Sequence, residues 1–246
     1  MKIQARKKFD RICVMVAMLG SAAIANTALI GCGNGNLFSS AVSRDDKDNG
    51  QLALQNGDYA GAAEYLKSYI AANPGDAQAR SMLTTALLKL SGIDEIQIAS
   101  SISSASSSSS NDWSTIVSAM PAGTEQNIAN LVLAKETIEA IPAEQRTSDQ
   151  NYQLAVASAA LGVTVAKKNL TDSSGAYAPT AEGIQAISDT DADLILSSIS
   201  TTATAATASG NSSTGLSKLG GIESQIQAQS GATPKEQLQN FLVSKM

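Results

Sequence analysis

The sequence predicts an all-α fold built from antiparallel helix pairs, and three observations support this prediction. Aromatic residues are only 4% of the chain, while alanine and serine are abundant, a composition typical of helices that pack closely through small side chains. Apolar residues between positions 52 and 90 recur at steps of three and four, the period of an amphipathic helix. Asn-Gly and Asn-Pro-Gly-Asp sequences divide these apolar stripes into segments of helix length.

Composition also argues against several classes of function. The chain of 246 residues contains no histidine and carries a formal net charge of −5. Histidine is the most common general base and a frequent metal ligand, so its absence argues against catalysis and against a metal site. The acidic balance argues against binding of the nucleic-acid backbone, which requires clusters of Lys and Arg. We therefore predict that the protein is not an enzyme, holds no cofactor or metal ion, and has no nucleic-acid partner.

The first 30 residues have the pattern of an export signal. Residues 1–11 contain five basic residues and one acid, and residues 12–30 contain no charge. A basic stretch followed by an apolar stretch is typical of a secretory signal peptide. The apolar stretch is also long enough to span a membrane, but its many small residues favour a segment that is removed.

The apolar stretch ends in Leu29-Ile30-Gly31-Cys32. This sequence resembles the lipobox of bacterial lipoproteins, in which a peptidase cleaves before the cysteine and the cysteine carries acyl chains. The resemblance implies that residues 1–31 are a lipoprotein signal peptide, cleaved between Gly31 and Cys32, and that lipidated Cys32 anchors the protein in a membrane. An uncleaved anchor and plain secretion are the alternatives. Gly33 in place of an aspartate implies, in this family, an outer-membrane lipoprotein of the cell envelope that faces the periplasm.

A polar tether and a group of helices follow. Residues 32–44 are polar and small, and we expect them to form a lipidated flexible tether. Residues 45–103 are expected to form helices, separated at Asn56-Gly57, at Asn73-Pro74 and at Ser91-Gly92.

Several residues in this helical region match the positions of a repeat family. They are the turn Asn56-Gly57-Asp58-Tyr59, Ala62, Leu66 and Pro74, together with Gly50 and Leu83. They resemble the tetratricopeptide repeat (TPR), whose period is about 34 residues. Arg80 and Thr84 depart from the pattern, because the family has Trp and Gly there. The resemblance covers residues 43–92 and implies TPR-like helical hairpins.

The resemblance also implies a partner-binding groove lined by the first helix of a repeat. On this chain the corresponding face is Gln78, Ser81, Thr85, Leu88 and Lys89. Its mixed polar character suits a reversible contact with a protein or peptide. The alternative is that this face packs against the C-terminal helices.

A linker and an irregular C-terminal helical region complete the chain. Residues 104–111 are rich in serine, which buries little apolar surface and competes for backbone hydrogen bonds, so we predict a linker there. A serine-lined helix end is the alternative. Residues 112–246 are expected to contain helices at 113–120, 125–141, 152–168, 189–208, 216–229 and 234–244. The third of these carries Ala and Gly on nearly all sides, which is typical of a central, fully packed helix.

A helix cap and a calcium loop are alternative interpretations of Asp189-x-Asp191-x-Asp193. An EF-hand loop needs Gly at its sixth position and Glu at its twelfth, where this chain has Leu194 and Ser200. We therefore favour capping of a helix by Asp189 or Asp191. By the same reasoning, Ser148 or Asp149 is expected to cap the helix at 152–168.

Together these observations predict a membrane-anchored lipoprotein of the cell envelope that acts as a non-enzymatic, TPR-like interaction scaffold for an unknown envelope protein or peptide. The alternative is a periplasmic solute- or small-molecule-binding lipoprotein, such as an accessory subunit of a transporter. Its pocket would lie between the C-terminal helices, around Trp113, Tyr152 and Tyr177. An open face at 78–89 would favour the scaffold, and a closed apolar cavity at these aromatic residues would favour the solute-binding protein.

Overall fold

The computed structural model describes residues 45–94, 112–172, 176–210 and 216–246. Apart from an isolated antiparallel bridge between Thr171 and Tyr177, the regular structure within these ranges is helical, which confirms the all-α prediction. The predicted signal peptide and the tether with Cys32 lie outside the described residues. The predicted serine-rich linker lies outside them as well.

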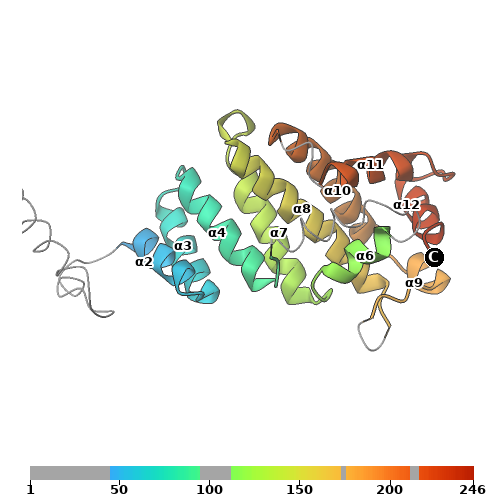
Figure 1. Ribbon diagram of the computed structural model, residues 1–246, viewed down its shortest axis with the longest axis horizontal. Coiled ribbons are helices and arrows are strands. Elements are labelled where there is room, and N and C mark those ends of the chain that lie inside the picture. Colours follow the sequence, from blue (N-terminus) through green and yellow to red (C-terminus); the bar gives the residue numbers. More distant parts are fainter. Residues whose placement is uncertain (1–44, 95–111, 173–175, 211–215) are drawn as a thin grey trace, which may run out of the picture. The chain divides into compact units, whose positions relative to one another are not determined.

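The helices follow one another along the chain (Figure 1). They are α2 (Asp46–Gln55), α3 (Tyr59–Ala72), α4 (Ala77–Leu90), α6 (Asp112–Ala119), α7 (Glu125–Glu139), the short 3-10 helix η2 (Ala143–Gln145), α8 (Ser148–Asn169), α9 (Ala181–Gln185), α10 (Asp189–Ala208), α11 (Leu216–Gln227) and α12 (Pro234–Val243).

The first three helices begin at aspartates that the turns supply. Asp45, Asp58 and Asp76 are their N-cap residues, and each carboxylate accepts a hydrogen bond from a backbone amide in the first turn. Between α2 and α3, Gly57 has a φ of +76°, a conformation that glycine adopts at little cost. The predicted helix breaks at Asn56-Gly57 and before Asp76 are therefore confirmed.

Small residues allow α2 and α3 to approach closely. Ala62 and Leu66 are fully buried on α3, and Gly50 of α2 faces Leu66. A Cβ added to Gly50 would lie 2.6 Å from Cγ of Leu66. The close contact explains why the repeat pattern has a glycine at position 50.

Beyond this hairpin, each helix packs mainly on its neighbours in a linear stack. The order of contacts is α2 on α3, α3 on α4, α4 on α7, α7 on α8 and α8 on α10 (Figure 1). Some helices two places apart in this order also touch each other. These pairs are α2 and α4, α4 and α8, and α8 and α11. Such nearest-neighbour packing is typical of repeat proteins. The sequence pattern indicated repeat character only up to residue 92, whereas the stacking continues through α10 to α11.

Two long connections interrupt the stack. The α2–α3 turn is short, but α4 is joined to α7 through residues 91–124 and α8 to α10 through residues 170–188. The first connection carries α6 and the second carries α9. Both helices meet the chain's last helix, α12: Trp113 of α6 packs edge-on against Phe241, with ring centroids 5.8 Å apart, and Gln239 Nε2 donates to the Ile184 carbonyl at 3.1 Å.

The helix α8 lies at the centre of the core, as its sequence predicts. Every residue from Leu154 to Lys167 is buried. Its closest neighbour is α10, which approaches over Gly162: a Cβ there would lie 3.1 Å from Cβ of Ser198. The many small side chains of α8 therefore permit close neighbours on all sides.

Two helix caps differ from the predicted residues. The N-cap of α8 is Thr147, in a capping box with Gln150, and that of α10 is Ser188, whose Oγ accepts from the Asp191 amide at 3.0 Å. In both cases the side-chain hydroxyl of the residue just before the first predicted cap accepts from a free backbone amide of the first turn. Asp189 and Asp191 instead occupy the first turn, where the positive end of the helix dipole stabilises them.

Candidate functional site

The predicted partner-binding face on α4 is partly covered by α8. Leu88 has no exposed surface and belongs to the core. Ser81 Oγ donates to Gln153 Oε1 at 2.5 Å, and Gln153 Nε2 donates to Thr85 Oγ1 at 3.1 Å. These contacts agree with the alternative that the face packs against C-terminal helices.

The rest of this face remains accessible. Gln78 is exposed, and Lys89 is half-buried, with its Nζ 3.7 Å from Asp94 Oδ2. On the adjoining second turn of α8, Tyr152 and Gln153 are half-buried. The structure therefore brings Gln78, Thr85 and Lys89 to a short surface that runs from α4 to the start of α8, which we call the α4 face.

A polar cluster behind this face ties the first three helices together. Asp76 Oδ2 lies 2.7 Å from Lys47 Nζ of α2 and 3.2 Å from the Tyr69 hydroxyl of α3. Burial by itself would raise the pKa of Asp76, but hydrogen bonds from Lys47, the Ala79 amide and Tyr69, together with the Lys47 charge, lower it overall. Sequence analysis identified Asp76 only as part of a turn, because its partners lie on other helices.

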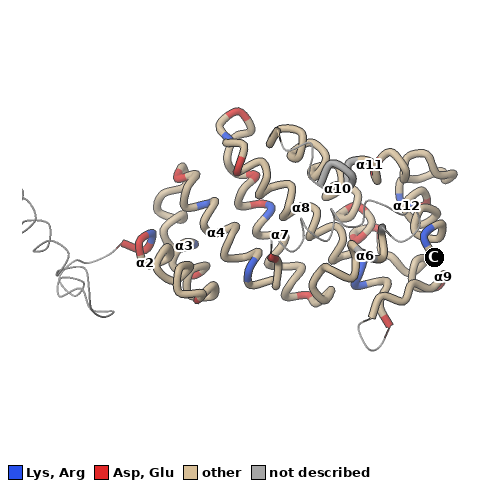
Figure 2. Tube along the Cα trace, viewed as in Figure 1, with Lys and Arg blue, Asp and Glu red and all other residues tan. Residues whose placement is uncertain are grey.

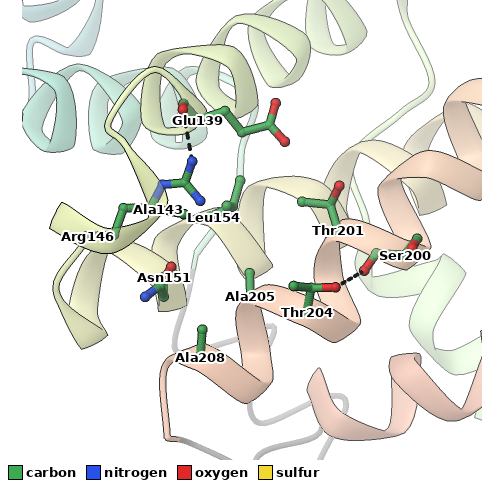
Figure 3. Close-up of a pocket in the computed structure, with 10 residues that line it drawn as sticks. All are labelled: Glu139, Ala143, Arg146, Asn151, Leu154, Ser200, Thr201, Thr204, Ala205 and Ala208. Atoms are coloured by element: carbon green, nitrogen blue, oxygen red, sulfur yellow. Dashed lines mark hydrogen bonds between the residues drawn. The ribbon is translucent and has the colours of Figure 1, made fainter.

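A second candidate site is a pocket of about 260 Å³ between α7, α8 and α10. Figure 3 shows Arg146 and Asn151, from the turn before α8 and from its first turn, opposite Thr201, Thr204 and Ala205 of α10. The pocket lies where the α7–α8 connection meets the C-terminal half of α10. The sequence gives no signal of this pocket, because none of the residues that line it forms a motif.

Arg146 is held in place by the C-terminal end of α7. Its Nε donates to the Ile141 carbonyl and its Nη2 to the Glu139 carbonyl, both at 2.8 Å. Figure 3 shows the second of these bonds. These carbonyls carry the partial negative charge of the helix end, which favours a cation there. The carboxylate of Glu139 is engaged separately, with both oxygens 2.7 Å from Lys135 Nζ.

Of the three aromatic residues of the predicted solute pocket, Trp113 and Tyr177 are neighbours, whereas Tyr152 lies apart from them. Tyr152 is in the second turn of α8, whereas Tyr177 follows its other end, where the Ala178 amide bonds the Leu170 carbonyl. Trp113 is buried against Phe241. Trp113 Nε1 and Tyr177 Oη are buried without a hydrogen-bond partner. Burial raises the pKa of the Tyr177 phenol, and the neighbouring Trp113 N–H opposes this rise.

The aspartates of the calcium hypothesis have separate partners. Asp189 Oδ1 lies 2.7 Å from Lys235 Nζ of α12, and Asp191 Oδ2 accepts from Asn169 Nδ2 at 3.3 Å. Across the described ranges, no group of three or more Cys, Asp or Glu side chains is placed to hold a metal ion.

Two further features concern surfaces and membranes. Lys and Arg are spread over several helices of the described chain rather than gathered on one of them (Figure 2). None of the helices in the described ranges has both the length and the apolar character needed to cross a bilayer.

Comparison with known proteins identifies one family. Neither the curated proteins nor the solved structures contain a match to this chain. The family model described as Tetratricopeptide repeat matches residues 53–95, from the end of α2 through α3 and α4. This is the part of the chain in which the turn, the buried small residues and the capping aspartates follow the repeat pattern. Residues 53–95 are therefore a TPR-like repeat.

Proposed function

We propose that this protein is a membrane-anchored lipoprotein of the cell envelope that binds another protein or a peptide as a non-enzymatic scaffold. The observation that carries this proposal is the TPR-like repeat at residues 53–95. Repeats of this kind are typically non-catalytic modules that bind other proteins. The linear stacking of helices up to α11 extends the scaffold beyond the repeat itself.

The sequence supports the membrane anchor. The basic residues 1–11, the uncharged residues 12–30 and the Leu29-Ile30-Gly31-Cys32 sequence occur in the order that lipoprotein processing requires. Two or three acyl chains on Cys32 would give stable anchoring, because each buried methylene contributes about 0.8 kcal/mol. Gly33 supports an outer-membrane location on the periplasmic side.

The α4 face is the proposed contact surface for the partner. It combines exposed Gln78 and half-buried Thr85 with Lys89, its one cation. Polar groups with a single positive charge suit a reversible contact whose orientation is set by hydrogen bonds and by one acidic group of the partner.

A pair of charge reversals tests this surface. Full-length protein with Lys89→Glu, captured from native envelope, is expected to lose a partner that wild-type protein retains. Lys67→Glu is the matched control, because Lys67 is exposed on α3 and undergoes the same change of charge away from the α4 face. Equal recovery of every partner with both variants would contradict the proposed surface.

A labelling experiment tests the anchor independently. Cells that express the protein are supplied with labelled palmitate, and the mature N-terminus is determined by mass spectrometry. Wild type is expected to carry label and to begin at Cys32, Cys32→Ala is expected to lose both features, and Cys13→Ala serves as the control that retains them. An unmodified Cys32, or a mature protein that keeps residues 1–31, would contradict the lipoprotein assignment.

A further inference from the structure

The pocket between α7, α8 and α10 contains polar groups that the protein itself leaves unpaired. Asn151 is only 8% exposed, lines the pocket, and forms no side-chain hydrogen bond within the described residues. A largely buried amide that has no protein partner is usually satisfied by water or a ligand, and the pocket is where either can reach Asn151. The Thr201 hydroxyl also lines the pocket without a hydrogen-bond partner in the described chain.

Arg146 supplies a fixed positive charge to the same pocket. Two of its nitrogens, Nε and Nη2, are occupied by carbonyls at the end of α7, which orients the guanidinium. Its Nη1 forms no hydrogen bond within the described residues and retains two N–H donors. Because Lys135 engages both oxygens of Glu139, the pocket's one carboxylate is already compensated.

These groups favour an anion with one negative charge. The free donors of Arg146, Asn151 and Thr201 match the two acceptor oxygens of a carboxylate. A phosphate group would need more than one cation and would be repelled more strongly by Glu139. Leu154 and Ala205 give the remaining wall an apolar part beside Ser200 and Thr204, and a volume of about 260 Å³ admits a molecule of roughly amino-acid size.

We propose that this pocket binds a small carboxylate. Its carboxylate group lies against Arg146, Asn151 and Thr201, and its short apolar body lies against Leu154 and Ala205. The carboxylate belongs either to a free organic acid or to the C-terminus of a peptide, since both present the same group. This inference depends neither on the lipid anchor nor on the α4 face.

Nuclear magnetic resonance of the ¹⁵N-labelled full-length protein can detect such binding. The probes are an unbranched series from acetate to hexanoate, the neutral analogue butyramide, acetyl-Ala-Ala with a free carboxylate, and the same dipeptide as its C-terminal amide. The acids are expected to shift the side-chain amide signals of Asn151 in a saturable manner, while butyramide binds at least about tenfold more weakly. Shifts with the free dipeptide but not with its amide would identify a peptide C-terminus, and shifts with the simple acids alone would identify a free acid.

Three variants locate the site. Asn151→Ala is expected to weaken binding about tenfold, and Thr201→Val a few-fold, because each removes one hydrogen-bonding group. Because Asn151→Ala has no side-chain amide, binding to the variants and to wild type is compared through the backbone amide signals of Leu154 and Ala205, which line the pocket. Thr207→Val is the matched control on α10, since Thr207 is exposed, bonds the Ala203 carbonyl and does not line the pocket. The inference is overturned if none of the carboxylates shifts Asn151, if butyramide binds as well as butyrate, or if Asn151→Ala and Thr201→Val bind as wild type does.

Discussion

At the scale of single residues, Asp76 contributes to three interactions at once. It caps α4 by accepting from the Ala79 amide at 2.9 Å, forms an ion pair with Lys47, and accepts a hydrogen bond from Tyr69. Its side chain is 21% exposed, so solvent screens the ion pair only in part. Three helices therefore depend on the ionised state of one carboxyl group.

The pH dependence of stability follows from the lowered pKa of Asp76. Below its ordinary pKa of 3.8 the unfolded chain binds this proton more readily than the folded chain, so the stabilisation is complete above pH 3.8 and is lost as the pH falls through the folded value. We expect Asp76→Asn, which can still cap α4, to lower the free energy of unfolding by about 1–2 kcal/mol at pH 7. Urea unfolding from pH 7 to pH 3 should show this difference shrinking.

The control for this prediction is Asp193→Asn. Asp193 is exposed on α10 and forms no ion pair within the described residues. This variant should match wild type at every pH. A constant difference between wild type and Asp76→Asn over the whole pH range would show that the ionised carboxylate is not what stabilises the cluster.

Glycine 123 shows how closely the first long connection lies against α8. A Cβ at this position would meet both N and Cα of Lys168 at 2.6 Å. Backbone atoms cannot move aside as a side chain can, so we expect Gly123→Ala to destabilise the protein by about 1–3 kcal/mol. Gly75→Ala, where no atom lies within 4 Å of the added Cβ, should stay within about 0.5 kcal/mol of wild type in the same urea titrations. Similar stabilities of the two variants would contradict this packing.

At the scale of secondary-structure elements, the sequence predicts features that depend on neighbouring residues better than contacts between residues far apart in the chain. The central position of α8 could be predicted because its own sequence has no charged side chain between Asp149 and Lys167 and is mostly small residues from Ala155 to Ala166. Helix starts were placed within a few residues, because capping and turn chemistry act over one turn. In contrast, the contact of Ser81 with Gln153 joins residues 72 positions apart, and nothing in the sequence near Ser81 indicates its partner.

The pocket could not be predicted from the sequence, because its walls come from residues that are far apart in the chain. Arg146 and Asn151 are close in sequence, but the opposite wall comes from α10, more than one helix further along the chain. The α4 face was predicted from the repeat pattern, yet that pattern describes a repeat surrounded by similar repeats. Here α8, which is not part of the matched repeat, packs beside α4, and its Gln153 forms hydrogen bonds with Ser81 and Thr85.

The last helix provides a test of how the two long connections are held. Phe241 is 1% exposed and packs on Trp113, whereas Val243 on the same helix is 49% exposed. We expect Phe241→Ala to cost about 3–5 kcal/mol through loss of buried surface and the cavity left behind. Val243→Ala should change stability by no more than about 0.5 kcal/mol.

Hydrogen exchange locates the effect of this substitution. In Phe241→Ala, amides of α6 and α12 should exchange faster, while those of α2 and α3 should exchange at wild-type rates if local opening is responsible. Uniform acceleration over all described helices would instead show that α12 and the stack unfold as one unit.

At the scale of the whole described chain, the order of contacts implies a gradient of stability. In a linear stack each helix is stabilised by its immediate neighbours, so a helix at an end has fewer stabilising interfaces than one in the middle. In α2, only Gly50 and Ala53 are buried, whereas in α8 every residue from Leu154 to Lys167 is buried. The α2 helix is therefore expected to open more easily than α8.

Native-state hydrogen exchange at increasing, sub-denaturing urea concentrations measures this gradient. Amides of α8 should open only with the free energy of global unfolding, while amides of α2 should open with a smaller free energy and a weaker dependence on urea, because less surface is exposed. Asp76→Asn should lower the opening free energy of α2 further, since Lys47 of α2 loses its ion pair. In the same variant, the opening free energy of α8 should still equal the free energy of global unfolding. Equal opening free energies for α2 and α8 would mean that the interfaces between helices are strong enough to make the stack a single cooperative unit, in which a partner bound at α4 would stabilise α10 as much as α2.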